Sequence, residues 1–333
     1  MCFYWQEINT VKKNEELTVR EISRIMSTLP TLYQITITGG EPMLRKDLAE
    51  IITTIHQTAH PSRVTIPTNG YFPEQTETLA NSITDQFPDK LLSINLSIDG
   101  VGELHNRIRG TQDSFERMLE TYDRLRLLQK KRPNLAIATA TVVTKENFPF
   151  MDPLLTFVEH RMDIHSHGLM LARGNVRDAS TMPTDTESFI ALLEKLYHKT
   201  CGSNSLNNAL AEAYLHSRVS TLRQQQMFDP CLAGRKLIVI NEVGTVLPCE
   251  ILPAIQTDHP HAPKDFIMGH LRDVDYNVPA LLATPKAKEI LQFIQGRNCW
   301  CTFECAQINN FVLNPLTYPR ILRRMLMNKL TNN

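Results

Sequence analysis

The sequence lacks any run of about 18 consecutive apolar residues, and this absence excludes a transmembrane helix. Its N-terminus lacks a charged segment followed by an apolar one, so no secretory signal is visible. It also lacks an excess of charge of either sign, because 35 Lys and Arg residues balance 35 Asp and Glu residues. A neutral chain is not a favoured partner for nucleic acid. We therefore expect a cytoplasmic protein that binds neither membranes nor nucleic acid.

What the sequence does contain is apolar material and cysteine. The chain has 333 residues, 42% of them hydrophobic, which suggests about two domains with ample core. Its seven cysteines are unevenly clustered. In a chain without a secretory signal, this clustering fits metal ligation in a reducing cytoplasm better than disulfide bonds.

Predicted strands and helices alternate along the first half of the chain. We expect strands at residues 33–38, 63–67, 91–98, 135–143 and 168–172, and helices at residues 15–29, 45–57, 74–83, 114–130 and 151–160. The first strand alternates apolar and β-branched residues, a pattern that predicts a buried strand. The alternation of elements indicates an α/β fold of parallel β/α units, in which chemistry gathers at the C-terminal strand ends.

Two glycines and a carboxylate follow the first predicted strand, in the block Thr38-Gly39-Gly40-Glu41-Pro42. Glycines at a strand end let a ligand approach the backbone closely. Glu41 could accept hydrogen bonds from a ligand ammonium group, a charge-assisted contact. Pro42 suits the start of the following helix. On these residues alone, an ordinary strand-to-helix turn is an equal alternative.

Other predicted strand ends also carry polar residues. Ser97 and Asp99 could bind the vicinal hydroxyls of a ribose, although an Asp-Gly turn is the alternative. Thr68-Asn69-Gly70 ends the preceding strand and is equally compatible with a plain turn. Arg109 lies in a predicted loop after Asp99, where it either meets a ligand carboxylate or is simply solvated.

Five cysteines lie in the C-terminal part of the chain, and we expect them to converge through a hairpin and a compact loop. They are Cys231, Cys249, Cys299, Cys301 and Cys305. Thiolates are soft ligands suited to zinc or to iron–sulfur clusters. Because cysteines at short spacing also make tetrahedral zinc sites, these residues alone leave both kinds of metal site open.

The glycine-rich block resembles the GGEP motif of radical S-adenosylmethionine (SAM) enzymes, which holds the amino group of SAM. These enzymes bind a 4Fe–4S cluster through a C-x3-C-x2-C loop, and Cys2 looks like its third cysteine; the first two are absent from this sequence. The resemblance implies a partial (β/α)6 radical SAM barrel lacking its first strand. It also implies a SAM site formed by Gly39, Gly40, Glu41, Pro42, Ser97, Asp99 and Arg173.

The C-terminal cysteines resemble the SPASM/Twitch extensions of radical SAM enzymes, which hold auxiliary clusters. The similarity lies in a C-x(n)-G-x4-C segment ending at Cys249 and in the final C-x3-C. It implies one auxiliary 4Fe–4S cluster. Its implied ligands are Cys231, Cys249 and Cys305, with Cys299 or Cys301 as the fourth.

The resemblance divides the chain into a core barrel at residues 1–180, a helical bridge at 181–226 and a small α+β cysteine-rich domain at 227–333. It implies an oxidoreductase whose cluster receives an electron from a donor such as a flavodoxin or ferredoxin. The reduced cluster then cleaves SAM to a 5′-deoxyadenosyl radical. That radical would abstract hydrogen from a substrate, for which we favour a peptide or protein side chain. Small-molecule cofactor biosynthesis is the alternative, because a GTP-cyclising branch also has a Twitch-like second cluster.

Two of the three cysteines for the SAM cluster are missing, so the chain as it stands is expected to be inactive. One explanation is a chain that begins inside the cluster loop. The other is a degenerate protein whose iron–sulfur or zinc site is only structural. We favour the first, because the SAM-contacting positions look intact and a missing first strand leaves a hydrophobic sheet edge unpaired.

Overall fold

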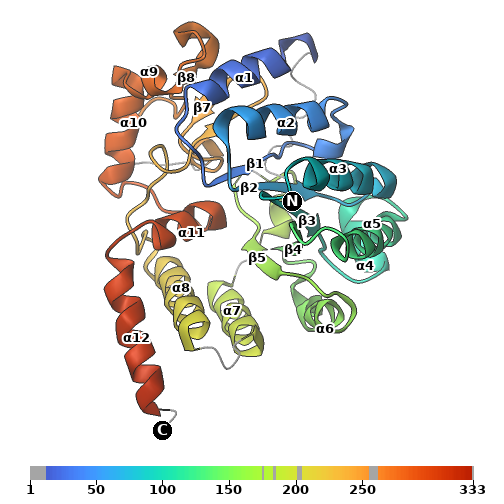
Figure 1. Cartoon of the computed structure of the whole chain (residues 1–333). Helices are drawn as coiled ribbons and strands as arrows, with labels where there is room; N and C mark the ends of the chain where they lie inside the picture. Colours follow the sequence, from blue (N-terminus) through green and yellow to red (C-terminus); the bar gives the residue numbers. More distant parts are fainter. Residues whose placement is uncertain (1–12, 175, 183–184, 201–204, 255–261, 332–333) are drawn as a thin grey trace.

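A five-stranded parallel sheet organises the first half of the protein. The computed structural model describes residues 13–174, 176–182, 185–200, 205–254 and 262–331. The strands are β1 (Gln34–Thr36), β2 (Arg63–Thr68), β3 (Leu91–Ser97), β4 (Leu135–Val143) and β5 (Ser166–Leu171). They pair side by side in chain order and form an open, curled sheet (Figure 1). The predicted α/β fold, a partial barrel of parallel strands, is therefore confirmed.

Helices cover the outer face of this sheet. They are α2 (Leu48–Ala59), α3 (Pro73–Gln86), α4 (Glu103–Arg109), α5 (Ser114–Gln129) and α6 (Met151–Arg161). Outward-facing strand residues such as Ile66 and Ile94 are fully buried in one core with Met118 of α5. None of the described helices is long and apolar enough to cross a bilayer.

One expectation about this layer was wrong. The segment after Asp99 was predicted to be a loop, but it forms the short helix α4. Gly110 ends this helix in a left-handed conformation with φ 71°, where its N–H bonds back to Asn106 and Arg107. Glycine is the residue that adopts this cap without strain.

The inner face of the sheet carries small and polar side chains. Because successive strand residues point to opposite faces, the register places these residues in rows across the sheet. The rows are Thr36–Thr65–Ser93–Ala136, Pro67–Asn95–Ala138–Ser166 and Ser97–Ala140–Gly168. Closed barrels fill this space with bulky branched residues. Here the inner face lacks such side chains in these rows and is suited to contact a ligand.

Strand β1 lies at the edge of the described sheet. Tyr33, just before it, is 77% exposed, and the strand itself alternates exposed and half-buried residues. The prediction of a buried first strand was therefore wrong. Period-two alternation shows which residues of a strand share a face. It does not show whether the strand has neighbours on both sides, and in the described chain β1 pairs only with β2.

The second half of the protein forms two further groups. Helices α7 (Thr186–Thr200) and α8 (Ser205–Gln224) pack side by side and contribute Phe189 and Val219 to the barrel core. The C-terminal group contains β6 (Val239–Ile240), β7 (Thr245–Leu247), β8 (Gly269–His270), α9 (Val278–Leu282), α10 (Pro285–Gln295), α11 (Glu304–Val312) and α12 (Thr317–Thr331). Its three strands pair antiparallel.

The first helix of the chain packs on this C-terminal group. Helix α1 (Val19–Ser27) begins with a capping box, in which Thr18 and Glu21 exchange hydrogen bonds. Its Ile25 is buried in the same core as Phe293 of α10. The backbone N–H of Leu17 donates to the carbonyl of Glu242 over 2.6 Å. Figure 1 shows α1 beside β7 and β8, so α1 and the C-terminal group share one core.

Candidate cofactor site at the strand ends and a cysteine cavity

The carboxylate of Glu41 joins the C-terminal ends of β1 and β2. Its Oε1 accepts hydrogen bonds from the N–H of Met43 (3.1 Å) and the hydroxyl of Thr68 (2.7 Å), and its Oε2 accepts one from the N–H of Asn69 (2.8 Å). Pro42 starts a short 3-10 turn, Pro42–Leu44, which brings the Met43 N–H to the carboxylate. A carboxylate offers about four acceptor positions, so these three bonds leave capacity for a ligand donor.

The glycines before Glu41 leave the backbone open. Gly39 and Gly40 are both exposed, and a Cβ built on either would meet nothing within 4 Å. Gly39 has φ 151°, a conformation that residues with a side chain rarely adopt. The backbone at this strand end is therefore accessible to a ligand, as the sequence predicted for the glycine pair.

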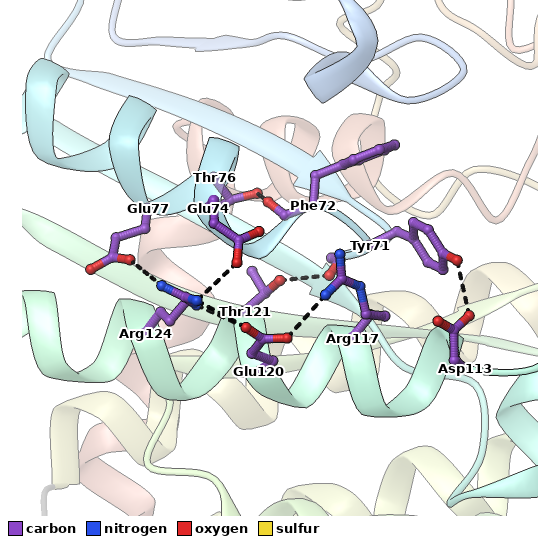
Figure 2. A network of polar contacts seen from close by, with 11 residues as sticks. Tyr71, Phe72, Glu74, Thr76, Glu77, Asp113, Arg117, Glu120, Thr121 and Arg124 are labelled. Atoms are coloured by element: carbon purple, nitrogen blue, oxygen red, sulfur yellow. Dashed lines mark hydrogen bonds and ion pairs between the residues drawn. The ribbon is translucent and has the colours of Figure 1, made fainter.

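A polar network supports the loop that follows β2 (Figure 2). The hydroxyl of Thr121 donates to the carbonyl of Gly70 over 2.6 Å, and the hydroxyl of Tyr71 donates to Asp113 over 2.9 Å. Farther along α3 and α5, Arg124 pairs with Glu74, Glu77 and Glu120. These contacts anchor the loop whose first residues, Thr68 and Asn69, hold Glu41.

Asp99 lies at the end of β3, and its carboxylate contacts other groups of the protein. It is fully buried, and its Oδ1 accepts a hydrogen bond from the N–H of Val142 in β4 over 2.9 Å. Its Oδ2 lies 2.5 Å from the guanidinium of Arg109. Arg109 thus forms an ion pair within the protein, which is neither of the two arrangements expected for it from the sequence. Ser97 is half-buried and lies in the inner row beside Ala140.

Arg173, just after β5, points toward the cysteine-rich part of the chain. Its guanidinium lies 2.5 Å from the carboxylate of Glu304 and donates to the carbonyl of Thr302 over 3.0 Å. Arg218 of α8 contacts the other oxygen of Glu304 over 3.3 Å. Glu304 at the start of α11 is therefore held between two arginines, and this contact joins β5 to the loop that carries Cys301.

Four of the five C-terminal cysteines surround a narrow cavity. Its lining residues are Cys231, Cys249, Cys299, Cys301, Met227, Ala233, Ile251, Leu252, Ile294, Trp300 and Ala306. The side chains other than the thiols are apolar. Both Cys299 and Cys301, which the sequence treated as alternatives, lie on this cavity. Cys305 is not among the lining residues. Four of the five cysteines that were expected to converge therefore do so at this cavity.

The chain supplies hydrogen-bond donors to several of these sulfurs. The backbone N–H of Ala233 counters the rise that burial causes in the pKa of the Cys231 thiol, and the N–H groups of Ile251 and Leu252 do the same for Cys249. Burial nevertheless raises the pKa of the Cys249 thiol to about 11 and that of Cys299 to about 12. A thiolate in this cavity would therefore need a cation beside it, and a bound metal would supply one.

The spacing of the cysteines bears on which metal they fit. Among the residues that the structure describes, no three His, Cys, Asp or Glu side chains are grouped closely enough to hold a single metal ion. Zinc needs all of its sulfur ligands about 2.3 Å from one centre. A cluster is bound differently, since each thiolate ligates its own iron at the periphery. Four thiols around a cavity therefore fit an iron–sulfur cluster better than one ion.

Cys305 and Glu250 form a second group next to Arg173. Cys305 lies in the first turn of α11 and keeps part of its surface exposed. The protein atoms packed around its thiol raise the pKa of that thiol to about 12 by burial, and the nearby carboxylates of Glu250 and Glu304 add to this effect. Burial also raises the pKa of Glu250, against the opposing charge of Arg173. The sequence analysis missed Glu250 as a functional candidate, although its position directly after Cys249 placed it beside the predicted metal site.

Comparison with known proteins identifies the barrel. Residues 1–149 match the family model of the Radical SAM superfamily, and the chain therefore carries a radical SAM domain. Solved structures of anSMEcpe share the fold. The one with bound AdoMet and a Kp18Cys peptide has a TM-score of 0.57 at 14% identity and covers 97% of this chain and 94% of that chain. A histidine-tagged form with bound AdoMet has a TM-score of 0.59 at 15% identity, covering 97% and 90%.

Curated relatives match a shorter part of the chain. A GTP 3′,8-cyclase of Haemophilus ducreyi is 28% identical over 151 residues, covering 45% of this chain and 42% of the relative. A GTP 3′,8-cyclase of Vibrio cholerae is 37% identical over 111 residues, covering 32% and 31%. The chain thus spans less than half the length of these relatives. Cys2, the predicted ligand of the SAM cluster, lies outside the described residues.

Proposed function

We propose that this protein acts in a radical SAM reaction that removes a hydrogen atom from a peptide or protein side chain. A reduced 4Fe–4S cluster with bound SAM supplies a 5′-deoxyadenosyl radical for such a reaction. The observation that supports the proposal is the join between the two candidate sites. The strand ends with Glu41 and the cysteine cavity belong to separate cores, and Arg173 ties them together through Glu304.

The residues at the strand ends are proposed to hold SAM. The backbone of Gly39 and Gly40 is open to a ligand, and Glu41 has a remaining acceptor position for an ammonium group. Ser97 on the inner face is the candidate for a ribose hydroxyl. Asp99 is proposed to act indirectly, because its carboxylate binds Val142 and Arg109 and so fixes the end of β3.

Glu250 is proposed to accept a proton that the substrate would lose after hydrogen-atom abstraction, with the remaining electron passing to the auxiliary cluster that the cysteines would hold. Its pKa is raised by burial, and it lies with Cys305 at the edge of the cysteine-rich part, close to Arg173. A carboxyl group with a raised pKa holds a proton more readily than an ordinary carboxyl group. Glu250→Gln should therefore slow product formation while leaving SAM cleavage in place, and equal loss of both would contradict this role.

We propose that Cys231, Cys249, Cys299 and Cys301 hold one auxiliary 4Fe–4S cluster. After anaerobic reconstitution, the chain should contain both iron and acid-labile sulfide. Cys299→Ser should lower both contents, whereas Cys305→Ser, which alters a cysteine outside the cavity, should not. Zinc without sulfide would refute the cluster. Loss of iron in the Cys305 variant but not in the Cys299 variant would refute this choice of ligands.

Two substrate classes can be separated by one assay. A protein extended by the upstream reading frame, where that frame supplies the two missing cysteines, is incubated with SAM, a reductant and either a peptide mixture or GTP. Release of 5′-deoxyadenosine that rises with peptide supports the proposal. A rise with GTP instead supports cofactor biosynthesis, which the GTP 3′,8-cyclase relatives favour. No release with any substrate, matched by a Glu41→Ala control, would leave a metal-binding protein without this activity.

A further inference from the structure

Asn310 connects α11 to the loop that carries Cys231. The residue is 1% exposed and lies on α11. Its side-chain Oδ1 accepts a hydrogen bond from the backbone N–H of Leu232 over 2.7 Å. Leu232 directly follows Cys231, so this bond fixes the amide group of Asn310 next to a cysteine of the cavity.

The other half of this amide has no partner in the protein. Among the described residues, Nδ2 of Asn310 is buried and forms no hydrogen bond of normal geometry. Leaving a buried donor unpaired costs about 1–3 kcal/mol, so such groups usually have an acceptor close by. Because the same amide binds the N–H of Leu232, which directly follows Cys231, this unpaired donor lies next to a cysteine of the cavity.

We propose that Asn310 is a positioning residue that donates a hydrogen bond from Nδ2 to the sulfur of Cys231 and thereby raises the reduction potential of the cluster on the four cysteines. This inference rests on the proposed auxiliary cluster. Reduction adds negative charge to the cluster and its sulfurs, and a donor aimed at a ligand sulfur stabilises that charge. The reduced form is therefore favoured.

Asn310 differs from the other donors at this site because substitution can remove it. The groups that donate to Cys231, Cys249 and Cys301 otherwise include backbone N–H groups, which every residue except proline retains. The unpaired donor of Asn310 belongs to a side chain, so a substitution removes it without altering the backbone.

Two substitutions and a matched control test the proposal. Asn310→Asp keeps an oxygen for Leu232 but loses the donor, and Asn310→Leu loses the donor without adding charge. The control is Asn314→Asp. Asn314 is also buried, its Oδ1 accepts from the N–H of Leu316 over 3.1 Å, and its Nδ2 is likewise unpaired in the described chain. It does not act on any of the four sulfurs.

The measurement is the midpoint potential of the reconstituted chain, followed by the EPR signal of the reduced cluster. Both Asn310 variants should have a lower potential, by a tenfold change in the reduction equilibrium or about 59 mV for one electron. The Asn314 variant should match the wild type. Unchanged potentials in both Asn310 variants would overturn the proposal. A shift in Asn310→Asp alone would also overturn it, because added charge would then explain the result.

A measurement on the wild-type protein covers the case in which the variants do not assemble. Protein labelled with 15N in the asparagine side-chain amides should show a 15N coupling to the reduced cluster in pulsed EPR, and its absence would overturn the proposal. The experiments separate the cluster from the hydrogen bond. A reconstituted chain without iron and sulfide refutes the auxiliary cluster itself, and Asn310 loses its role with it. A cluster whose potential ignores Asn310 refutes only the hydrogen bond.

Discussion

Replacement of Glu21 by glutamine tests how strongly α1 is held by the C-terminal part of the protein. Oε1 of Glu21 accepts hydrogen bonds from Nε of Arg272 (2.8 Å) and the hydroxyl of Tyr276 (2.7 Å), and Oε2 accepts one from the N–H of Thr18 (2.8 Å). The bond from Arg272 has the largest effect, and together these contacts lower the pKa of Glu21 from 4.5 to about 2.

The size of the effect follows from this pKa. Each unit of difference in pKa between the folded and the unfolded chain is worth about 1.4 kcal/mol, so the contribution of Glu21 to the free energy of unfolding is at most about 3 kcal/mol. The side chain of Arg272 is 38% exposed, and solvent screens the pair. We therefore expect Glu21→Gln to lower the free energy of unfolding by about 1–2 kcal/mol at pH 7.

The pH dependence carries the sharper test. Because the pKa of Glu21 is lower in the folded chain, its contribution is fully present above pH 4.5 and is lost as the pH falls toward 2. Guanidinium denaturation of wild type and Glu21→Gln across this range should show the difference between them closing. Glu50→Gln, at an exposed position of α2, is the control and should differ little from wild type at any pH. A difference that stays constant down to pH 2 would refute the reasoning.

Three further outcomes can be measured by the same denaturation method. Gly70→Ala should lower the free energy of unfolding by about 2–3 kcal/mol, because φ is +73° and the added Cβ would lie 3.1 Å from Cα of Met118. Gly102→Ala, where φ is +57° but the space is open, should lower it by only about 1 kcal/mol. Equal losses in the two variants would contradict the steric argument. Asp99→Asn should cost about 3 kcal/mol, because it leaves Arg109 without its buried partner, and an unchanged midpoint would show that the pair contributes nothing. The stability of the wild type should fall as the pH drops from 6.5 to about 4. Burial lowers the pKa of His105 and of His167 to about 4 in the folded chain, whereas the same histidines already take up protons in the unfolded chain. Constant stability over this range would contradict both values.

Much of the fold follows from local sequence patterns. The predicted strand at 135–143 has the same bounds as β4, and the predicted helix at 114–130 differs from α5 by one residue. Both segments combine a strong period with turn residues on either side, which is the situation in which pattern and tertiary structure agree. The exposed face of β1 was not predictable in this way, because exposure depends on which elements cover a strand.

The candidate site shows the same division. Glycine pairs and strand-end carboxylates carry their own signal, and Glu41 does lie where two strand ends meet. No local sequence signal reveals the partners of Arg173 and Asp99. Arg173 pairs with Glu304, far along the chain, and Asp99 pairs with Arg109, on a helix that was predicted as a loop. Cys305 illustrates a second limit. Its spacing to Cys301 is that of a ligand pair, but it lies in the first turn of α11 and does not line the cavity.

The shared core of α1 and the C-terminal group sets an order of events during protein synthesis. Ile25 shares its core with Phe293, which leaves the ribosome more than 250 residues later. At about 5–20 residues per second, this delay is on the order of 10–50 s. Through that interval α1 has α2 to pack against, but its Ile25 lacks the C-terminal residues that complete its core. A chain that terminates before α10 would leave Ile25 of α1 without part of its core permanently.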